Sequence, residues 1–392
     1  MGKLGLKVLM FSTDRNLFEE GSAVSERIKE YGRLVEELHI IVLCDKSHTK
    51  DLKIENGKLK IAEGVFLYPT NSSFKFMRPR NAASIGKKLV REKGFVRGQS
   101  LITTQDPFEC GWAGLRVKKK WRLPLEVQLH TDPFSSEFSG HLNSVRKRLA
   151  KKVLPQADHI RVVSASLKST LIHDSRFMIP DSKISVLPIF VDKNREKDMP
   201  TFDLHTRFGW KFILLTVSRL TEEKNLPLAL QVLALLRQRY SSVGLVIVGA
   251  GPEEESLKKL AKTLNIERNV AFEGWQEDLA SYYKTANAYI QTSRFEGYGM
   301  SLVEAGLSGL PVVTTPVGVA NDMENGKELY ICPQDDAGYF ANAIADLIDN
   351  NSHRENLRIN MKNFLNSHLL SKEDYLNQLK KNWQETASKV LN

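Results

Sequence analysis

The sequence predicts two doubly wound α/β domains, each with a mostly parallel sheet and helices on both faces. Short apolar segments alternate with helical segments along the chain, which is the rhythm of strand–helix–strand units. A polar stretch at 192–210 interrupts that rhythm, which then restarts. The 392 residues are enough for two domains at roughly 100–200 residues each.

In the first half, apolar runs predict strands at 6–11, 39–44, 64–68, 100–103, 125–130, 159–164 and 184–187. Helices are expected between several of them. The clearest helical signal follows the first strand, where apolar residues recur every three or four positions at Val24, Ile28, Tyr31, Val35 and Leu38. That spacing predicts one face of a helix.

In the second half, strands are predicted at 212–217, 243–248, 269–273, 288–291 and 311–314, with helices at 226–237, 253–264 and 301–307. A last helix at 371–390 carries Leu376, Leu379, Trp383 and Ala387 on one stripe. We therefore assign residues 1–191 to a first domain, 192–210 to a linker, 211–368 to a second domain and 369–392 to a terminal helix.

Composition excludes several classes of protein. The apolar run from Val8 to Phe11 is too short for the core of a signal peptide, and no stretch reaches the ~18 apolar residues of a membrane span. We expect a cytoplasmic protein. The three cysteines, Cys44, Cys110 and Cys332, lack metal-ligand or redox spacing, so we expect them to be buried as small hydrophobic side chains.

The net charge of +10 is concentrated in the first half of the chain. Residues 1–200 hold 36 of the 56 Lys and Arg residues but only 23 of the 46 acidic ones. The excess clusters at 78–97, 116–122 and 146–152. A positive face of this kind attracts nucleic acid, anionic lipid head groups or phosphorylated substrates, although each cluster is equally compatible with an ordinary solvated surface.

The strongest motif is Arg294-Phe-Glu-Gly-Tyr-Gly-Met-Ser-Leu-Val-Glu304, which follows a predicted strand and enters a helix. Its two carboxylates, Glu296 and Glu304, stand eight positions apart with a Gly-x-Gly between them. The glycines let the backbone approach a ligand closely, and free N–H groups at a helix start suit a phosphate. The motif therefore predicts a pocket for sugar hydroxyls and phosphate.

A second motif, Ser218-Arg-Leu-Thr-Glu-Glu-Lys-Asn225, follows another predicted strand. Arg219 offers a fork of donors and Lys224 a point charge, so the two are able to converge on one anion. They would neutralise a diphosphate leaving group. Alone, such a pair is usually a solvated face, but two motifs that each follow a strand of one domain are more specific.

With these residues the chain resembles the retaining glycosyltransferases of family 4, which have the GT-B fold of two facing Rossmann-like domains. Glu296 and Glu304 match the family's paired-glutamate signature, and Arg219 and Lys224 match its diphosphate pair. The segments 247–252 and 270–275 are also similar to the family's pattern. The resemblance is strongest from 214 to 317 and covers most of the chain. It implies that the terminal helix crosses back onto the first domain.

The resemblance implies a donor on the second domain and an acceptor on the first. Arg219 and Lys224 would bind the diphosphate, Glu296 the transferred sugar and Glu304 the ribose. Further donor contacts would come from Gly21, Ser22, Gly249, Gly251, Trp275, Gly299, Met300 and Ser301, and His130 would contact sugar and phosphate. Without the resemblance, a lone strand-end histidine such as His130 is more often structural.

Two departures from the family pattern stand out. The loop at Gly21 is poorer in glycine than is common, and Val-Gly-Val-Ala-Asn-Asp322 follows Pro316 where the family often has Gly-Gly-x-x-Glu. No Asp-x-Asp motif occurs, which agrees with charge neutralisation by Arg219 and Lys224 and leads us to expect no metal. The resemblance implies transfer with retention, assisted by the leaving phosphate, from a UDP- or GDP-linked sugar.

The acceptor is the most open part of the interpretation. The segment 142–153 places Leu142, Val145, Leu149 and Val153 on one helical face and basic residues on the others. Such a helix rests on anionic lipid or is a core helix with a basic solvent face. A glycan or lipid-linked acceptor and peripheral membrane contact follow from the first alternative. A nucleotide-sugar epimerase of the same fold and a nucleic-acid-binding protein are the rival classes, and no nucleic-acid recognition motif supports the latter.

Overall fold

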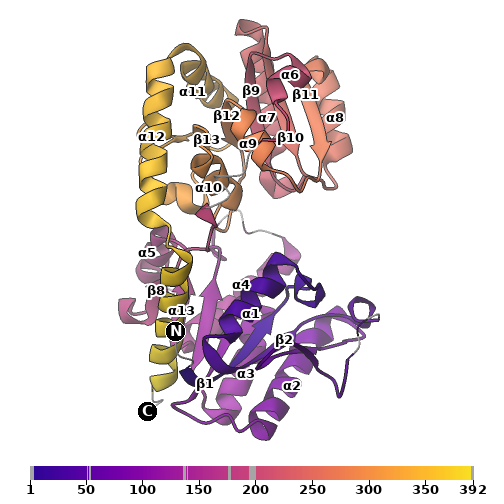
Figure 1. The fold of residues 1–392 in the computed structure, drawn as a ribbon, viewed down its shortest axis with the longest axis vertical. Helices are drawn as coiled ribbons and strands as arrows, with labels where there is room; N and C mark the ends of the chain where they lie inside the picture. The colour runs from indigo at the N-terminus through magenta and orange to yellow at the C-terminus, as the bar shows by residue number, and fades with distance from the viewer. Residues whose placement is uncertain are drawn as a thin grey trace. The chain divides into compact units, whose positions relative to one another are not determined.

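The computed structural model describes residues 4–50, 52, 54–135, 138, 140–174, 178–193 and 200–389. The chain divides into two compact units, which we call unit 1 (Met1–Leu187 with Ser371–Asn392) and unit 2 (Pro188–Leu370). Each unit has its own sheet of mostly parallel strands with helices on both faces (Figure 1). The predicted fold class is therefore confirmed.

Unit 1 has an eight-stranded sheet in the order β3-β4-β2-β1-β5-β6-β7-β8. The strands are β1 (Leu4–Ser12), β2 (Val35–Val42), β3 (Leu59–Ala62), β4 (Val65–Pro69), β5 (Ser100–Thr104), β6 (Leu125–Leu129), β7 (His159–Val162) and β8 (Ile184–Val186). Every pairing is parallel except that of β3 with β4. The central strands are buried almost throughout, because helices cover both faces of the sheet.

The helices of unit 1 are α1 (Ala23–Gly32), α2 (Arg78–Glu92), α3 (Glu109–Trp121), α4 (His141–Val153), α5 (Ala165–His173) and α13 (Lys372–Ser388). Short 3₁₀ segments are η1 (Asn16–Phe18), η2 (Lys46–His48), η3 (Lys75–Met77), η4 (Leu154–Gln156) and η5 (Asp181–Lys183). The strand order reverses between β1 and β5, because β1 pairs with β2 on one side and β5 on the other. Ligands of open α/β sheets bind at such a switch point, beyond the carboxyl ends of the strands.

The last helix, α13, belongs to unit 1 although 183 residues of unit 2 precede it in the chain. The hydroxyls of Tyr31 and Tyr375 lie 2.8 Å apart, and the indole N–H of Trp383 donates to the Glu126 carboxylate (3.2 Å). Trp383 is completely buried. The predicted stripe is correct apart from its first turn, where Tyr375 is buried in place of Leu376.

The Glu126 carboxylate is buried inside unit 1 and anchors this contact. It also accepts hydrogen bonds from Thr103 (2.9 Å) and contacts the imidazole of His159 (3.1 Å). Burial opposes ionisation of this carboxyl, but the hydrogen bond from His159 and the charge of Arg161 hold its pKa below the usual value. The buried charge is thus paired, as its burial requires.

The first predicted helix is shorter than expected. Helix α1 ends at Gly32, and Val35 and Leu38 lie in strand β2. Apolar residues continue to recur every three or four positions across the turn into β2. The sequence of helix, turn and strand therefore has the same pattern as one long helical face. At Gly32 a Cβ atom would lie 2.1 Å from a methyl group of Val65, so the helix end packs closely on the sheet. The three cysteines are buried, as predicted.

Unit 2 has a six-stranded, all-parallel sheet in the order β11-β10-β9-β12-β13-β14. Its strands are β9 (Phe212–Val217), β10 (Val243–Val248), β11 (Val270–Gly274), β12 (Ala288–Gln291), β13 (Val312–Thr314) and β14 (Tyr330–Ile331). Its helices are α6 (Leu204–Phe208), α7 (Leu226–Arg239), α8 (Glu254–Thr263), α9 (Ala280–Thr285), α10 (Met300–Leu307), α11 (Ala337–Asp349) and α12 (Asn351–His368), with 3₁₀ segments η7 (Glu222–Lys224), η8 (Glu267–Asn269) and η9 (Gly318–Asp322). Here the strand order reverses between β9 and β12.

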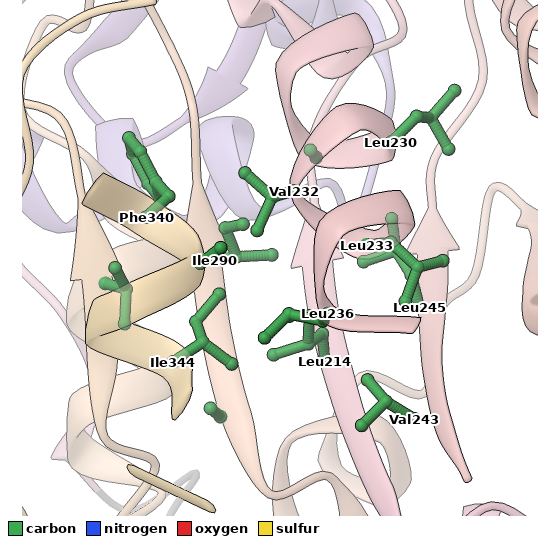
Figure 2. Packing of buried hydrophobic residues seen from close by; sticks show 14 of the residues in the cluster. Leu214, Leu230, Val232, Leu233, Leu236, Val243, Leu245, Ile290, Phe340 and Ile344 are labelled. Atoms are coloured by element: carbon green, nitrogen blue, oxygen red, sulfur yellow. The ribbon is translucent and has the colours of Figure 1, made fainter. Parts of the chain in front are cut away.

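The core of unit 2 lies between the sheet and helices α7 and α11 (Figure 2). Leu233 and Leu236 of α7 point toward Leu214 and Leu245 of the strands, and Ile344 of α11 lies beside them. All five side chains are almost fully buried. This packing fixes the strands whose carboxyl ends carry both sequence motifs.

Several elements were not predicted from the sequence, namely β3, β14, α9, α11 and α12. Strand β14 has only two residues, and β3 is an antiparallel edge strand. Within the predicted linker, residues 194–199 lie outside the described residues. The described part of the linker contains the short helix α6.

Candidate functional site

The two sequence motifs meet at the switch point of the unit 2 sheet. The loop 218–225 follows β9 and the loop 292–299 follows β12, which are the two strands on either side of the reversal. Asn225 has a left-handed conformation (φ 48°), and α7 begins directly afterwards at Leu226, with Pro227 in its first turn. This turn ends η7 at Lys224 and directs the chain back along the sheet.

Lys224 and Glu296 form an ion pair at this point. The Lys224 ammonium lies 2.7 Å from Oε1 of Glu296, and the two side chains are 14% and 12% exposed. The hydroxyl of Ser293 donates to the same carboxylate oxygen (2.7 Å). Removal from bulk water strengthens the attraction and fixes both groups, so a cation and a hydrogen-bond acceptor are presented side by side.

Backbone contacts hold the two loops together. The N–H of Arg294 donates to the carbonyl of Glu223 (2.9 Å), and the Thr292 hydroxyl donates to the carbonyl of Lys224 (3.1 Å). These bonds join residues about 70 positions apart and set the distance between the two charged side chains. Ser293 and Thr292 were not singled out from the sequence, because a Ser or Thr after a strand is common.

Arg219 lies on the same loop but is far more exposed. Its side chain is 75% exposed and contacts Glu223 (3.2 Å). Partial burial of Glu223 favours its protonated form. Hydrogen bonds from Thr221 and the backbone, together with the charges of Arg219 and Lys224, outweigh this effect and lower the pKa of the Glu223 carboxyl. Arg219 is therefore free to reorient toward an anion at small cost, because an exposed ion pair contributes little.

The glycines at 249 and 251 shape the Arg219 loop from behind. A Cβ atom on Gly249 would lie 1.8 Å from the Ser218 carbonyl oxygen, and one on Gly251 would lie 2.3 Å from that of Leu220. The N–H of Leu220 donates to the carbonyl of Ala250 (3.1 Å). The structure thus gives both predicted donor-binding glycines a packing role, since no larger residue fits between these loops.

The start of α10 brings together Gly299, Met300 and Ser301. Gly299 has φ +90°, a left-handed conformation that turns the backbone sharply into the helix, and a Cβ there would meet Leu302 at an ordinary contact distance of 3.8 Å. The Ser301 hydroxyl accepts from Tyr289 (2.8 Å), and one turn further the Glu304 carboxylate accepts from Tyr283 (3.2 Å).

Burial raises the pKa of Tyr289, which keeps its phenol protonated as a donor. The two tyrosines orient the hydroxyl of Ser301 and the carboxylate of Glu304. Neither was recognised from the sequence, because both read as core aromatics.

The segment after Pro316, which departs from the family pattern, lies directly against this site. Gly318 has φ +56°, and a Cβ there would lie 2.5 Å from the carbonyl oxygen of Tyr298. The N–H of Val319 donates to that same carbonyl (2.8 Å). The divergent residues therefore support the loop between Glu296 and Gly299 from behind.

Trp275 follows β11 and is 70% exposed. It lies in the same unit as the Lys224–Glu296 pair, and no contact with that pair is recorded. Its flat, exposed ring is suited to stacking on a planar ligand.

The remaining predicted site residues lie in unit 1. His130 follows β6 and is half-buried; burial and then the charges of Arg161 and Arg27 lower its pKa to about 4, so the imidazole is neutral at pH 7. Gly21 (φ +78°) and Ser22 precede α1, and the Ser22 hydroxyl caps that helix by accepting from the N–H of Ser25 (3.1 Å).

The Ser22 hydroxyl also donates to the carbonyl of Asn16 (2.6 Å). Its side chain is therefore already used within unit 1, and its backbone remains available. Within the described ranges, no group of three or more His, Cys, Asp or Glu residues is arranged to hold a metal ion. No helix in the described part of the chain has the length and apolarity to cross a bilayer.

Two family models match the chain that carries these strand-end loops. Residues 203–364 match the model described as glycosyl transferases group 1, and residues 32–195 match glycosyltransferase family 4. The chain belongs to the family 4 glycosyltransferases of GT-B fold, and the predicted family is confirmed.

Known proteins similar to the chain agree with this assignment. It is 34% identical to an uncharacterized glycosyltransferase from Haemophilus influenzae over 139 residues, which are 35% of this chain and 39% of that protein. It is 27% identical to alpha-monoglucosyldiacylglycerol synthase from Streptococcus pneumoniae over 64% of this chain and 60% of that protein. The matched regions thus span only about two fifths and three fifths of these relatives.

Solved structures show the same fold. The structure of Anabaena HepE in complex with UDP superposes with a TM-score of 0.74 at 18% identity, over 97% of this chain and all of the other. At this identity the likeness establishes the fold alone.

Proposed function

We propose that the chain is a retaining glycosyltransferase that moves a sugar from a nucleotide-sugar donor to a hydroxyl group of a glycan or lipid acceptor. The observation that carries the proposal is the Lys224–Glu296 pair at the switch point of unit 2. A cation for the diphosphate and a carboxylate for sugar hydroxyls stand 2.7 Å apart at the position where open α/β sheets bind ligands.

Each residue of the site then has a role. Arg219 and Lys224 neutralise charge on the diphosphate, and Glu296 accepts hydrogen bonds from hydroxyls of the sugar. The N–H groups of Met300 and Ser301 add donors at the start of α10. Glu304 holds the ribose, and Trp275 lies beside the base.

In unit 1, His130 and the backbone of Gly21 and Ser22 would approach the donor from the acceptor side. The neutral imidazole of His130 is able to donate to a sugar or phosphate oxygen without adding a charge.

We propose transfer with retention in a single same-face step, without a covalent intermediate on Glu296. Glu296 is held by Lys224 and Ser293, which leaves it poorly suited to attack the anomeric carbon. In the proposed step the bond from the anomeric carbon to the phosphate oxygen breaks, and a bond to the acceptor oxygen forms on the same face. The acceptor's proton passes to the leaving phosphate. The protein contributes positioning and charge stabilisation.

The donor is expected to be UDP- or GDP-linked, and HepE, a protein of the same fold, was solved with UDP. We expect one nucleotide among UDP, GDP and ADP, or its sugar, to raise the melting temperature of the wild type but not of Arg219→Ala. Arg268→Ala is the matched control, because Arg268 is an exposed arginine of unit 2 without a recorded ion pair.

Stabilisation that survives in Arg219→Ala would remove that residue from the site. No stabilisation by any of the nucleotides would contradict the transferase assignment. The anomeric configuration of the product, measured by NMR, then tests retention, and a free epimerised nucleotide sugar would indicate an epimerase instead.

The basic surface of unit 1 supports peripheral contact with an anionic membrane, on its cytoplasmic face. The relative from Streptococcus pneumoniae is named for a glucosylated diacylglycerol product, which is a lipid. We expect the protein to co-sediment with vesicles that contain phosphatidylglycerol at low salt and to be released at high salt. Absence of binding at low salt would contradict the membrane contact.

A further inference from the structure

Unit 1 contains a hollow of about 640 Å³ at its own switch point. Thr13 and Arg15, which follow β1, and Asp106, which follows β5, contribute to its wall. Helices α2, α3 and α4 supply most of the remainder. The size falls within the range of roughly 300–1,000 Å³ typical of small-molecule sites, and its place in the sheet is where such sites form.

One wall of the hollow is apolar and largely exposed. Leu142 and Val145 of α4 are 61% and 51% exposed. They share one helical face with Val153, which is fully buried at the other end of the helix. Phe76 lies on the same hollow and is 72% exposed. A contiguous exposed apolar surface beside a cavity indicates a binding surface for an apolar group.

Most of the charged residues that line the hollow are basic. Five cations and two carboxylates line the hollow, and both carboxylates are already engaged. Glu109 pairs with Arg146 (3.1 Å), and Asp106 accepts the N–H of Phe108 (2.7 Å). Among the described residues, no carboxylate pairs with Lys75 or Arg80. The ammonium group of Lys75 and the guanidinium group of Arg80 are therefore available to an anion.

The position of these cations is itself unusual. Helix α2 begins Arg78-Pro79-Arg80 and has no acidic residue in its first turn. Positive charges at a helix N-terminus oppose the helix dipole, whereas an anion there is stabilised by it. The Asp45 carboxylate already accepts from Nε of Arg78 (2.8 Å), which leaves Lys75 and Arg80 as the cations that an anion bound here would neutralise.

We propose that the hollow between α2 and α4 binds the acceptor, and that the acceptor is an anionic amphiphile: its phosphate contacts Lys75 and Arg80, and its hydrocarbon lies against Phe76, Leu142 and Val145. This rests on the proposed transferase function and specifies its acceptor. One molecule enters a defined hollow, which distinguishes this site from general attraction of the basic surface to a membrane.

The probe is octyl phosphate below its critical micelle concentration, titrated calorimetrically into the full chain without nucleotide. Inorganic phosphate offers the head group alone, and octyl glucoside offers the tail with a neutral head. We expect octyl phosphate to bind about tenfold more tightly than either, because only it uses both walls. Equal binding of inorganic phosphate would indicate a plain anion site and would overturn the proposal, as would no binding of octyl phosphate.

Two matched pairs of variants locate the site. Val145→Ser is compared with Val96→Ser, because both valines lie in unit 1 and both are 51% exposed. Arg80→Gln is compared with Arg148→Gln, an exposed arginine of α4 that does not line the hollow. We expect the first member of each pair to weaken octyl phosphate binding about fivefold or more and the second less than about twofold. Equal effects within either pair would overturn the proposal.

Failure of this inference is distinguishable from failure of the proposed function. Octyl phosphate binding is measured without a donor and without sugar transfer, so its result does not depend on whether the protein is a transferase. If the nucleotide assay succeeds and octyl phosphate does not bind, the transferase assignment survives with a different acceptor. Circular dichroism of each variant checks that binding is lost from a folded protein.

Discussion

The two units share one architecture but finish their switch points differently. In unit 2 the loops after β9 and β12 are bound to each other, and the Lys224–Glu296 pair lies at the reversal point. In unit 1 the corresponding point between β1 and β5 is a hollow with one apolar wall. A hydrogen-bonded switch point that presents a cation beside a carboxylate suits a small, highly charged ligand whose shape is constant, whereas an apolar hollow suits a ligand that brings its own bulk.

The two switch points therefore differ in how much substitution they tolerate. The site in unit 2 depends on glycines and hydrogen bonds that tolerate little change, because backbone meets backbone at Gly249, Gly251 and Gly318. The hollow in unit 1 depends on exposed side chains that are free to vary without disturbing the fold, such as Leu142 and Val145.

The largest effect is expected at Gly249. Its substitution by alanine places a Cβ 1.8 Å from the Ser218 carbonyl oxygen at φ +132°, so the Arg219 loop must move. We expect the free energy of opening of unit 2 to fall by about 4 kcal/mol, from overpacking and backbone strain together, with loss of nucleotide binding. Hydrogen exchange of the β9 and β10 amides measures the change.

Gly274→Ala is the control for Gly249→Ala. Gly274 also has positive φ (+66°), but no atom lies within 4 Å of its Cβ position. An equal loss of stability in both variants would assign the effect to backbone conformation and would remove the argument from close packing.

Lys224→Ala should lower the transfer rate about a hundredfold, on the scale of losing one charge-stabilising group. The measurement is kcat with the nucleotide sugar that stabilises the protein. Lys259→Ala, an exposed lysine on α8, should change kcat less than about twofold. If turnover by Lys224→Ala equals that of the wild type, Lys224 has no part in the chemistry.

In unit 1 we expect a pH effect at His130. Its pKa of about 4 lies below the usual 6.5, so between these values the unfolded chain binds the proton more readily than the folded one. The stability present above pH 6.5 is therefore lost as the pH falls toward 4. Relative to His130→Gln, the wild type should lose about 2 kcal/mol across this window, measured by urea unfolding at each pH. Parallel pH profiles for the two proteins would contradict the lowered pKa.

The smallest effect is expected at Ser22. Ser22→Ala removes the cap of α1 and should lower the free energy of unfolding by about 1 kcal/mol, whereas Ser73→Ala, at an exposed loop position, should change it little. Nucleotide binding should be unchanged, because the backbone N–H groups remain. A clear loss of nucleotide binding would instead show that the hydroxyl itself contacts the donor.

Much of unit 2 and its site was predictable from the sequence. The strands are continuous apolar runs, and the charged motifs follow them directly, so the edge of the sheet on which they lie was determined by parallel topology. Lys224 and Glu296 were predicted to share a site, and the structure brings them into contact. Ser293, Tyr283 and Tyr289 were missed because their roles depend on distances across the sheet.

The missed features of unit 1 have a different physical cause. The spacing of Val24 to Leu38 imitated one helix because helix and strand both place apolar residues at some shared intervals. The apolar face of α4 was recognised from the spacing of its residues. That spacing does not tell which half of the face is buried against the rest of the unit and which half is exposed. The hollow therefore emerged only from the packed structure.

The route of the chain through unit 1 has a consequence for synthesis of the protein. Unit 2 is one continuous stretch, Pro188–Leu370, whereas unit 1 is completed by α13. Until Trp383 has left the ribosome, Glu126 lacks its indole partner and Tyr31 lacks Tyr375. The unit that is translated first is thus completed last, because α13 is made only after the whole of unit 2.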